Sequence, residues 1–278
     1  MFKKIAIITG YVLLTLGLAA YFYFSTMLTS KEMSRVVCNK IDVRILDKND
    51  NRFVSEAEIV SELKMLGITP GESKIKHINQ FETEKYLNGK NAVKRTDVSV
   101  NINGVVRVDV TQRRPILRLE TDNGGFYMDD EAYIFPLVST FCSNVPVVSG
   151  NIPLQLNSGY RGKCKFNKEW AESLLKFGIF LSNNPLWNDL SEQIYIDDKS
   201  DLYIVPRIGG QEIIFGDLED IEEKFNKLSA FYKDIIPNEG WDKYKAVDLR
   251  FHKQIVCKLR HSKQIIDTTT TSQQIKNI

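Results

Sequence analysis

The distribution of apolar and polar residues separates an uncharged N-terminal stretch from a longer region of mixed character. Residues 5–24 carry no charged side chain, Lys3 and Lys4 precede them, and aromatic residues occupy positions 21–24. About 20 apolar residues form a helix that can cross the ~30 Å hydrocarbon core of a bilayer, and aromatic rings favour the membrane interface. The pattern therefore predicts a transmembrane helix at residues 5–24, in contact with lipid, and residues 1–4 in the cytoplasm.

A cleaved signal peptide is the alternative interpretation of this stretch. Residues 17–20 (Gly-Leu-Ala-Ala) resemble a small-residue cleavage site. The uncharged stretch is longer, however, than the apolar core of about 7 to 15 residues that signal peptides usually have. Its length favours a retained anchor.

A polar linker at residues 25–37 and then a strand are predicted after the anchor. Ile41, Val43 and Ile45 alternate with polar residues. This period of two is typical of a strand with one buried face.

Two helices are predicted next. Ser55 and Glu58 have the spacing of a capping box, in which both side chains satisfy backbone amides at a helix start. That helix is expected to end at Gly67, because glycine favours the end of a helix. A shorter helix is predicted at residues 79–88, before Gly89.

A hairpin is the clearest local signal. Apolar and polar residues alternate at positions 98–102 and again at 106–110, with Asn103 and Gly104 between them. Asn and Gly tolerate the positive φ angles of a two-residue type I′ turn. Residues 38–113 are therefore predicted to form one β-α-α-β-β domain.

Residues 114–260 are predicted to form a mainly antiparallel β domain with packed helices, which makes the fold class α+β. Apolar stripes predict helices near residues 170–181 and 218–228, and Asp217 is a candidate cap for the second. Short strands are predicted at residues 116–119, 125–128, 132–135, 145–148, 193–196, 202–208, 211–215, 246–251 and 255–259. The tail, residues 261–278, is predicted to be disordered.

Charge and cysteine content limit the possible partners. The net charge of +2 and the scattered basic residues do not indicate nucleic acid binding. The cysteines, at positions 38, 142, 164 and 257, show no metal-binding or disulfide-framework spacing. Isolated buried thiols are expected, and a Cys142–Cys164 bridge stays open.

The sequence contains no recognisable catalytic constellation. The motifs of the nucleophile elbow, the zinc proteases, the P-loop and the dinucleotide-binding fold are absent from it. His77, His252 and His261 are expected at the surface, and the acidic residues 129–131 in a turn. We expect no catalytic site, metal, cofactor or small-molecule substrate.

Several short motifs carry a resemblance to a known family. Residues 111–116 (Thr-Gln-Arg-Arg-Pro-Ile) are followed by Phe-Tyr-Met-Asp at 126–129 and Phe-Pro at 135–136. Val-Pro-Val-Val-Ser-Gly stands at 145–150, and Val-Asp-Leu-Arg-Phe at 247–251. In this order they resemble the bacterial division proteins of the FtsQ/DivIB family, whose POTRA and β domains meet at the first motif.

The resemblance implies a POTRA-like domain at residues 38–113, a β domain at 114–260 and a non-enzymatic scaffold of the division machinery. It also implies one inner-membrane anchor, a periplasmic bulk, and FtsB- and FtsL-type single-span partners. The chain departs from the family at Phe251, where Tyr is usual, and at His252 and Lys253, where the turn often contains Asn, Asp or Gly.

The family's C-terminal strands receive a partner segment, and any exposed strand edge offers unpaired N–H and C=O groups to such a segment. The predicted partner-binding residues are Leu249, Arg250, Phe251, Ile255, Val256 and Lys258. Because side chains alternate between the faces of a strand, the alternative for the inward-facing members is a place in the core.

Two other functions remain open. Another POTRA-bearing assembly or secretion factor would usually continue into a membrane barrel with strands of about 9 to 11 residues, and the predicted strands after residue 116 are shorter. An anchored exported enzyme would need a cleft with titratable groups of shifted pKa.

Overall fold

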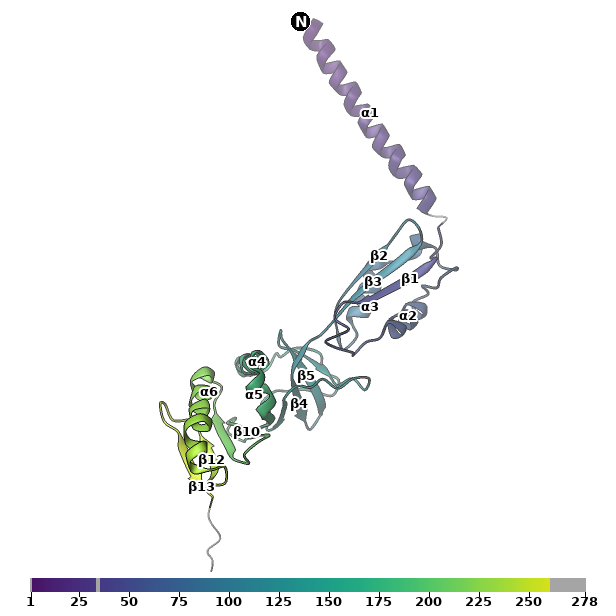
Figure 1. Ribbon diagram of the computed structural model, residues 1–278. Helices are drawn as coiled ribbons and strands as arrows, with labels where there is room; N and C mark the ends of the chain where they lie inside the picture. The colour runs from purple at the N-terminus through teal and green to yellow at the C-terminus, as the bar shows by residue number, and fades with distance from the viewer. Residues whose placement is uncertain (1, 34–35, 261–278) are drawn as a thin grey trace, which may run out of the picture. The chain divides into compact units, whose positions relative to one another are not determined.

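The computed structural model describes residues 2–33 and 36–260, which form two compact units. The first unit holds the described residues up to Arg114 together with Val138–Ser143, and the second holds Pro115–Leu137 and the described residues from Asn144 onward. Figure 1 labels many of their helices and strands. The predicted disordered tail, with His261, lies outside the described residues.

Helix α1 (Phe2–Met33) contains the predicted span and continues beyond it. Its window Gly10–Met27 has the length and composition of a membrane span, and 0% of it is buried. Residues 25–33, expected in a linker, are helical. They contain neither Gly nor Pro, and the Thr26 hydroxyl donates to the Tyr23 carbonyl without interrupting the helix.

The first unit has the predicted β-α-α-β-β order. Its elements are β1 (Lys40–Ile45), α2 (Glu56–Met65), the 3-10 turn η1 (Ile75–His77), α3 (Gln80–Asn88), β2 (Val93–Val100) and β3 (Val105–Gln112). The three strands lie side by side in the order β1-β3-β2, with β1 parallel and β2 antiparallel to β3 (Figure 1). The helices contribute Ile59, Leu63 and Leu87 to the core.

Local signals define both ends of α2. The Ser55 hydroxyl oxygen accepts a hydrogen bond from the Glu58 amide at 3.1 Å, which confirms that half of the capping box. At the other end Gly67 has a φ of 78°, and its amide and the next one donate to the carbonyls of Lys64 and Leu63. These two bonds form a Schellman motif, which favours glycine at the left-handed position.

The hairpin between β2 and β3 is confirmed, but its turn differs from the prediction. The Asn101 amide donates to the Val105 carbonyl, and the Gly104 amide donates to the Asn101 carbonyl. Gly104 has a φ of 77°, whereas Asn103 has no positive φ. The loop is therefore a three-residue turn that ends in a left-handed glycine, not a type I′ turn, and Ile102 is exposed in it.

Gln112, at the end of β3, joins the sheet to the turn after β1. Its side-chain nitrogen donates to the Asn51 carbonyl at 2.8 Å, and its side-chain oxygen accepts from the Val54 amide at 2.9 Å. Its backbone amide donates to the Asp47 carboxylate at 3.0 Å. Gln112 is buried, and these bonds supply the partners that its buried polar groups need. The glutamine of the motif at residues 111–116 therefore has a structural role.

The segment Val138–Ser143 belongs to the first unit, although strands of the second unit flank it. The Phe141 ring meets the Phe53 ring edge-on, with 4.9 Å between their centroids. The Thr140 hydroxyl donates to the Phe53 carbonyl at 2.9 Å. The sequence analysis had assigned this whole segment to the β domain.

The described strands of the second unit form one ten-stranded sheet in the order β13-β12-β11-β10-β9-β7-β4-β5-β6-β8. Neighbours are antiparallel except at β4–β7, β7–β9 and β11–β12, so the sheet is mainly antiparallel as predicted. The strands are β4 (Pro115–Thr121), β5 (Gly124–Asp129), β6 (Tyr133–Pro136), β7 (Val147–Gly150), β8 (Gly162–Lys163), β9 (Ser191–Ile196), β10 (Leu202–Pro206), β11 (Glu212–Gly216), β12 (Tyr244–Asp248) and β13 (Val256–Leu259).

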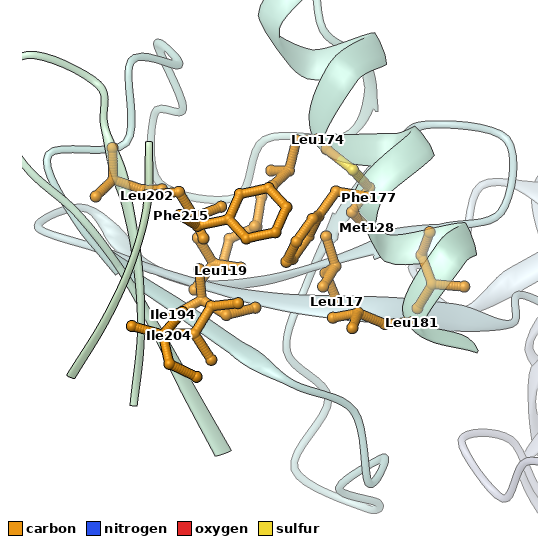
Figure 2. Close-up of a cluster of buried hydrophobic side chains, with 14 of the residues drawn as sticks. Leu117, Leu119, Met128, Leu174, Phe177, Leu181, Ile194, Leu202, Ile204 and Phe215 are labelled. Carbon is orange, nitrogen blue, oxygen red and sulfur yellow. The ribbon is translucent and has the colours of Figure 1, made fainter. Parts of the chain in front are cut away.

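Helical segments of the second unit also contribute side chains to the hydrophobic core beneath this sheet. They are α4 (Lys168–Asn183), α5 (Pro185–Leu190), α6 (Ile221–Ala230), the π-helical turn η2 (Phe231–Ile235) and α7 (Ile236–Glu239). Figure 2 shows Leu174 and Phe177 of α4 above Leu117 of β4 and beside Phe215 of β11, and Leu181 of α4 belongs to the same core. The short elements α5, η2, α7 and β8 were not predicted, because segments of two to six residues are too short to show a helix or strand period in the sequence.

Asp217 does not act as the expected cap of α6. The helix begins after Asp220, which has a φ of 48° and makes no side-chain cap bond. Asp217 instead accepts from the Glu219 amide and from the buried Lys224 ammonium. Burial raises the pKa of Asp217, but the hydrogen bond from Lys224 contributes most to lowering it below its usual value.

The expectations for single polar residues and thiols hold in part. Cys38 and Cys164 are buried as expected, whereas Cys142 is exposed and Cys257 is half-buried. These four described thiols form no disulfide. Asp129, expected in a turn, is the buried last residue of β5 and accepts bonds from the amides of Glu131 and Tyr133, whereas His77 and His252 are exposed as expected.

We expect Gly104→Ala to destabilise the first unit by about 1 to 3 kcal/mol more than Gly67→Ala. The φ angles are nearly the same, 77° and 78°, so backbone strain is matched. A Cβ at Gly104 would lie 2.3 Å from the Val37 carbonyl oxygen, whereas one at Gly67 would meet nothing within 4 Å. Denaturant-induced unfolding measures the difference, and equal losses would contradict the close approach.

Candidate partner-binding edge of the second unit

Strand β13 ends the sheet and pairs with β12 alone among the described strands. The antiparallel register places Val256 opposite Asp248, Cys257 opposite Val247, and Lys258 opposite the residue before Val247. The outer side of β13 therefore offers unpaired N–H and C=O groups, as every edge strand does.

A row of outward-facing side chains runs across the neighbouring strands from β9 to β13 and ends at this edge. The registers place Tyr195, Tyr203, Ile214, Asp248 and Val256 opposite one another on successive strands. Directly opposed residues lie on the same face of a sheet. The row is largely apolar and only partly covered, since Tyr195 and Val256 are each 45% exposed.

The opposite face of β12 and β13 belongs to the core. Val247 and Leu249 are both 0% exposed. Ile255 and Cys257 pack against the same core while remaining partly exposed. Of the predicted partner-binding residues, Leu249 thus lies in the core, and Ile255 lies between core and surface.

Arg250 is held by two carboxylates. Its Nη2 lies 2.7 Å from Asp248, and its Nη1 lies 3.1 Å from Asp201. Burial raises the pKa of Asp248, but the hydrogen bonds and charge of Arg250 outweigh burial and hold that pKa below its usual value. The hydrogen bond with Asp248 in turn raises the pKa of Arg250. Arg250 therefore braces the end of β12 while keeping part of its side chain at the surface.

Helix α6 clasps the loop between β12 and β13. Lys227 Nζ donates to the carbonyls of Leu249 and Phe251, both at 2.7 Å. Glu223 accepts from the Lys253 amide at 3.1 Å, and this bond contributes most to lowering the pKa of Glu223. We call these bonds the Lys227–Glu223 clasp, which holds the loop at both ends.

The clasped loop presents an aromatic side chain to solvent. Phe251 is 48% exposed, and Lys258 on β13 is also exposed. Lys253 has a φ of 56°, in the left-handed region that favours Gly, Asn and Asp. Lys adopts this backbone conformation less readily than Gly, Asn or Asp does.

The sequence analysis missed the clasp and the outward row. Alternation indicates which residues of one strand share a face, but not which strands become neighbours. Lys227 and Glu223 looked like an ordinary charged helix face, and nothing in their spacing indicated two carbonyl partners about 22 to 24 residues away.

Comparison with known protein families identifies the family to which the chain belongs. The family description FtsQ/DivIB, C-terminal related, matches residues 114–258, more than half of the chain. The chain belongs to the FtsQ/DivIB family. A POTRA-like domain matches residues 36–111, the β-α-α-β-β region. A search of curated proteins found no match.

Membership of the FtsQ/DivIB family confirms the resemblance and the fold class. Both matched domains are non-catalytic types, and together they indicate a division-associated scaffold that acts through protein–protein interactions. Helix α1 is compatible with the membrane anchor of this family.

We expect Lys227→Met to loosen the loop between β12 and β13. It removes the shared donor of two carbonyls, one part-buried and one exposed, and a typical intramolecular hydrogen bond contributes about 0.5 to 1.5 kcal/mol to stability. Hydrogen exchange of residues 249–253 should become faster. Lys233→Met is the matched control, because Lys233 is exposed. Equal exchange in both variants would contradict the clasp.

The pH dependence of stability should report the Asp248–Arg250 pair. The folded-state pKa of Asp248 lies below its ordinary 3.8, so the ionised carboxylate stabilises the fold above that pH. This contribution is lost as the pH falls through the folded-state pKa. Asp248→Asn should lower stability at neutral pH and flatten its decline in acid. Unfolding curves across this range test it, and an unchanged acid decline would show that the pair contributes nothing.

Proposed function

We propose that the chain is a membrane-anchored scaffold of the bacterial division machinery whose β13 edge receives an extended segment of a partner. The partners are single-span division proteins of the FtsB and FtsL type, as the family resemblance implies. In this proposal α1 crosses the inner membrane with the N-terminus in the cytoplasm and both folded units in the periplasm.

The open edge of β13 beside a clasped aromatic residue is the observation that carries this proposal. A segment added to β13 would satisfy its free backbone groups, and alternate side chains of that segment would extend the row that ends at Val256. Phe251 and Val256 offer apolar surface, and aromatic residues are enriched at the buried centre of protein interfaces.

The predicted site residues divide into two roles. Arg250, Phe251, Val256 and Lys258 have exposed side chains and are the proposed contact residues. Leu249 and Ile255 support them from the core side, since their side chains are buried and half-buried. A second function, as another POTRA-bearing assembly factor, is disfavoured because residues 114–258 match the FtsQ/DivIB-related domain.

We expect Phe251→Arg to weaken partner binding by at least about tenfold, which corresponds to ~1.4 kcal/mol. Ile208→Arg is the matched control, because Ile208 is also an exposed apolar residue, between β10 and β11. Binding of an FtsB-type periplasmic segment and the melting temperature are measured for both variants. Equal binding would overturn the proposed site, and a melting temperature lowered only by Phe251→Arg would assign Phe251 to the core.

In-cell photo-crosslinking from position 251 identifies the partner directly. Capture of a small single-span protein of the FtsB type supports the scaffold function. Capture of outer-membrane assembly components would favour the alternative function.

A further inference from the structure

Backbone bonds attach the turn at residues 73–77 to the chain that follows α1. The Ile75 amide donates to the Val36 carbonyl at 3.1 Å, and the Cys38 amide donates to the Ser73 carbonyl at 2.7 Å. Val37 and Lys74 form an antiparallel bridge between these bonds. This turn, which we call the basic turn, is therefore tied to residues that come directly after the anchor.

Chain length limits the distance between the basic turn and α1. The helix ends at Met33, and the extended chain from Met33 to Val36 spans at most about 11 Å. The bond from Ile75 to Val36 adds 3.1 Å. Ile75 therefore lies within about 15 Å of the end of α1, in whichever direction the chain leaves the helix.

The end of α1 lies near the membrane surface if α1 is the anchor, so this inference rests on the proposed anchoring. The apolar window ends at Met27 and the helix ends at Met33, which adds about 9 Å at the rise of an α-helix. The headgroup region extends about 5 to 7 Å beyond the hydrocarbon core. The basic turn is thus within reach of the lipid headgroups.

The basic turn carries two lysines that are available to bind an anion. Lys74 and Lys76 are exposed, and within residues 36–260 neither forms an ion pair. Lys31 and Arg35 add positive charge to the sequence between the apolar window and the first unit.

Three carboxylates oppose this charge. Glu32 lies in the same stretch of sequence, and Glu72 and Glu82 line a hollow of about 610 Å³ beside the turn. Lys74 and His77 line the same hollow, and Glu82 lies 4.0 Å from Lys85. Positive charge is therefore in excess on the turn itself, which has no acidic residue.

We infer that the basic turn binds the phosphate headgroups of anionic membrane lipids through Lys74 and Lys76. Each lysine close to an anionic surface should favour the bound state about fivefold. Attachment within about 15 Å of the anchor keeps the local concentration of headgroups high, and the attraction falls off beyond about 10 Å of salt solution. The contact restricts the directions in which the first unit can extend from its anchor.

The full-length chain in lipid nanodiscs tests this inference. Lysine acylation followed by mass spectrometry measures the access of reagent to Lys74 and Lys76, with the exposed Lys199 and Lys233 of the second unit as references. In discs of equal parts phosphatidylglycerol and phosphatidylcholine, Lys74 and Lys76 should react at least about fivefold more slowly than in phosphatidylcholine alone. High salt should remove the difference, and the references should not change.

A matched pair of variants separates binding by these lysines from a general charge effect. Lys74→Gln with Lys76→Gln should abolish the lipid-dependent protection of residues 73–78 in hydrogen exchange. Lys199→Gln with Lys233→Gln changes the net charge equally and should retain it. Equal rates in both kinds of disc would overturn the lipid contact while leaving the anchor and the β13 site standing. A chain that does not enter the discs would overturn the anchoring and this inference together.

Discussion

The register between β12 and β13 is the constraint on which the candidate site depends. It sends Cys257 toward the core and leaves Val256 and Lys258 outside. A shift of one residue would exchange these faces, because side chains in a strand alternate with a period of two. The Lys227–Glu223 clasp opposes such a shift, since it holds the loop carbonyls and the Lys253 amide at fixed positions on α6.

An exposed edge strand is a hazard as well as an opportunity, because it can pair with any extended chain. Two features of β13 limit this hazard: the strand has only four residues, and Lys258 projects from it into solvent. Short length and charge discourage pairing between copies of the chain. Phe251 and Val256 nevertheless leave apolar surface on the same edge. This combination of charge, short length and apolar surface favours binding of a partner with matching side chains over pairing with any extended chain.

Local patterns predicted the elements well because their causes are local. Alternation located the hairpin strands, and Ser55 and Gly67 marked the two ends of α2. The order of strands could not be predicted in the same way. The parallel pairing of β4 with β7 and of β7 with β9 joins strands that lie far apart in the sequence. A local alternation pattern does not indicate which distant strand becomes a neighbour.

Alternation also explains why the site prediction was mixed. Val247, Leu249 and Phe251 share one face of an uninterrupted strand, and the first two are indeed buried. Strand β12 ends at Asp248, however, and the left-handed turn at Lys253 changes the direction of the chain. Phe251 therefore leaves the core face, and its exposure follows from the loop and not from the strand pattern.

The boundary of the first unit shows a limit of the same kind. Five elements complete the β-α-α-β-β order by residue 112, yet Phe53 is covered by Phe141, which comes 88 positions later than Phe53 in the sequence. Thr140 adds a bond to the Phe53 carbonyl. A first unit cut after Arg114 would lose the Phe141 ring contact and the Thr140 bond to Phe53, because both residues belong to Val138–Ser143. The first unit is therefore complete only with Val138–Ser143, which lies between β6 and β7 in the sequence and contributes these two contacts to Phe53.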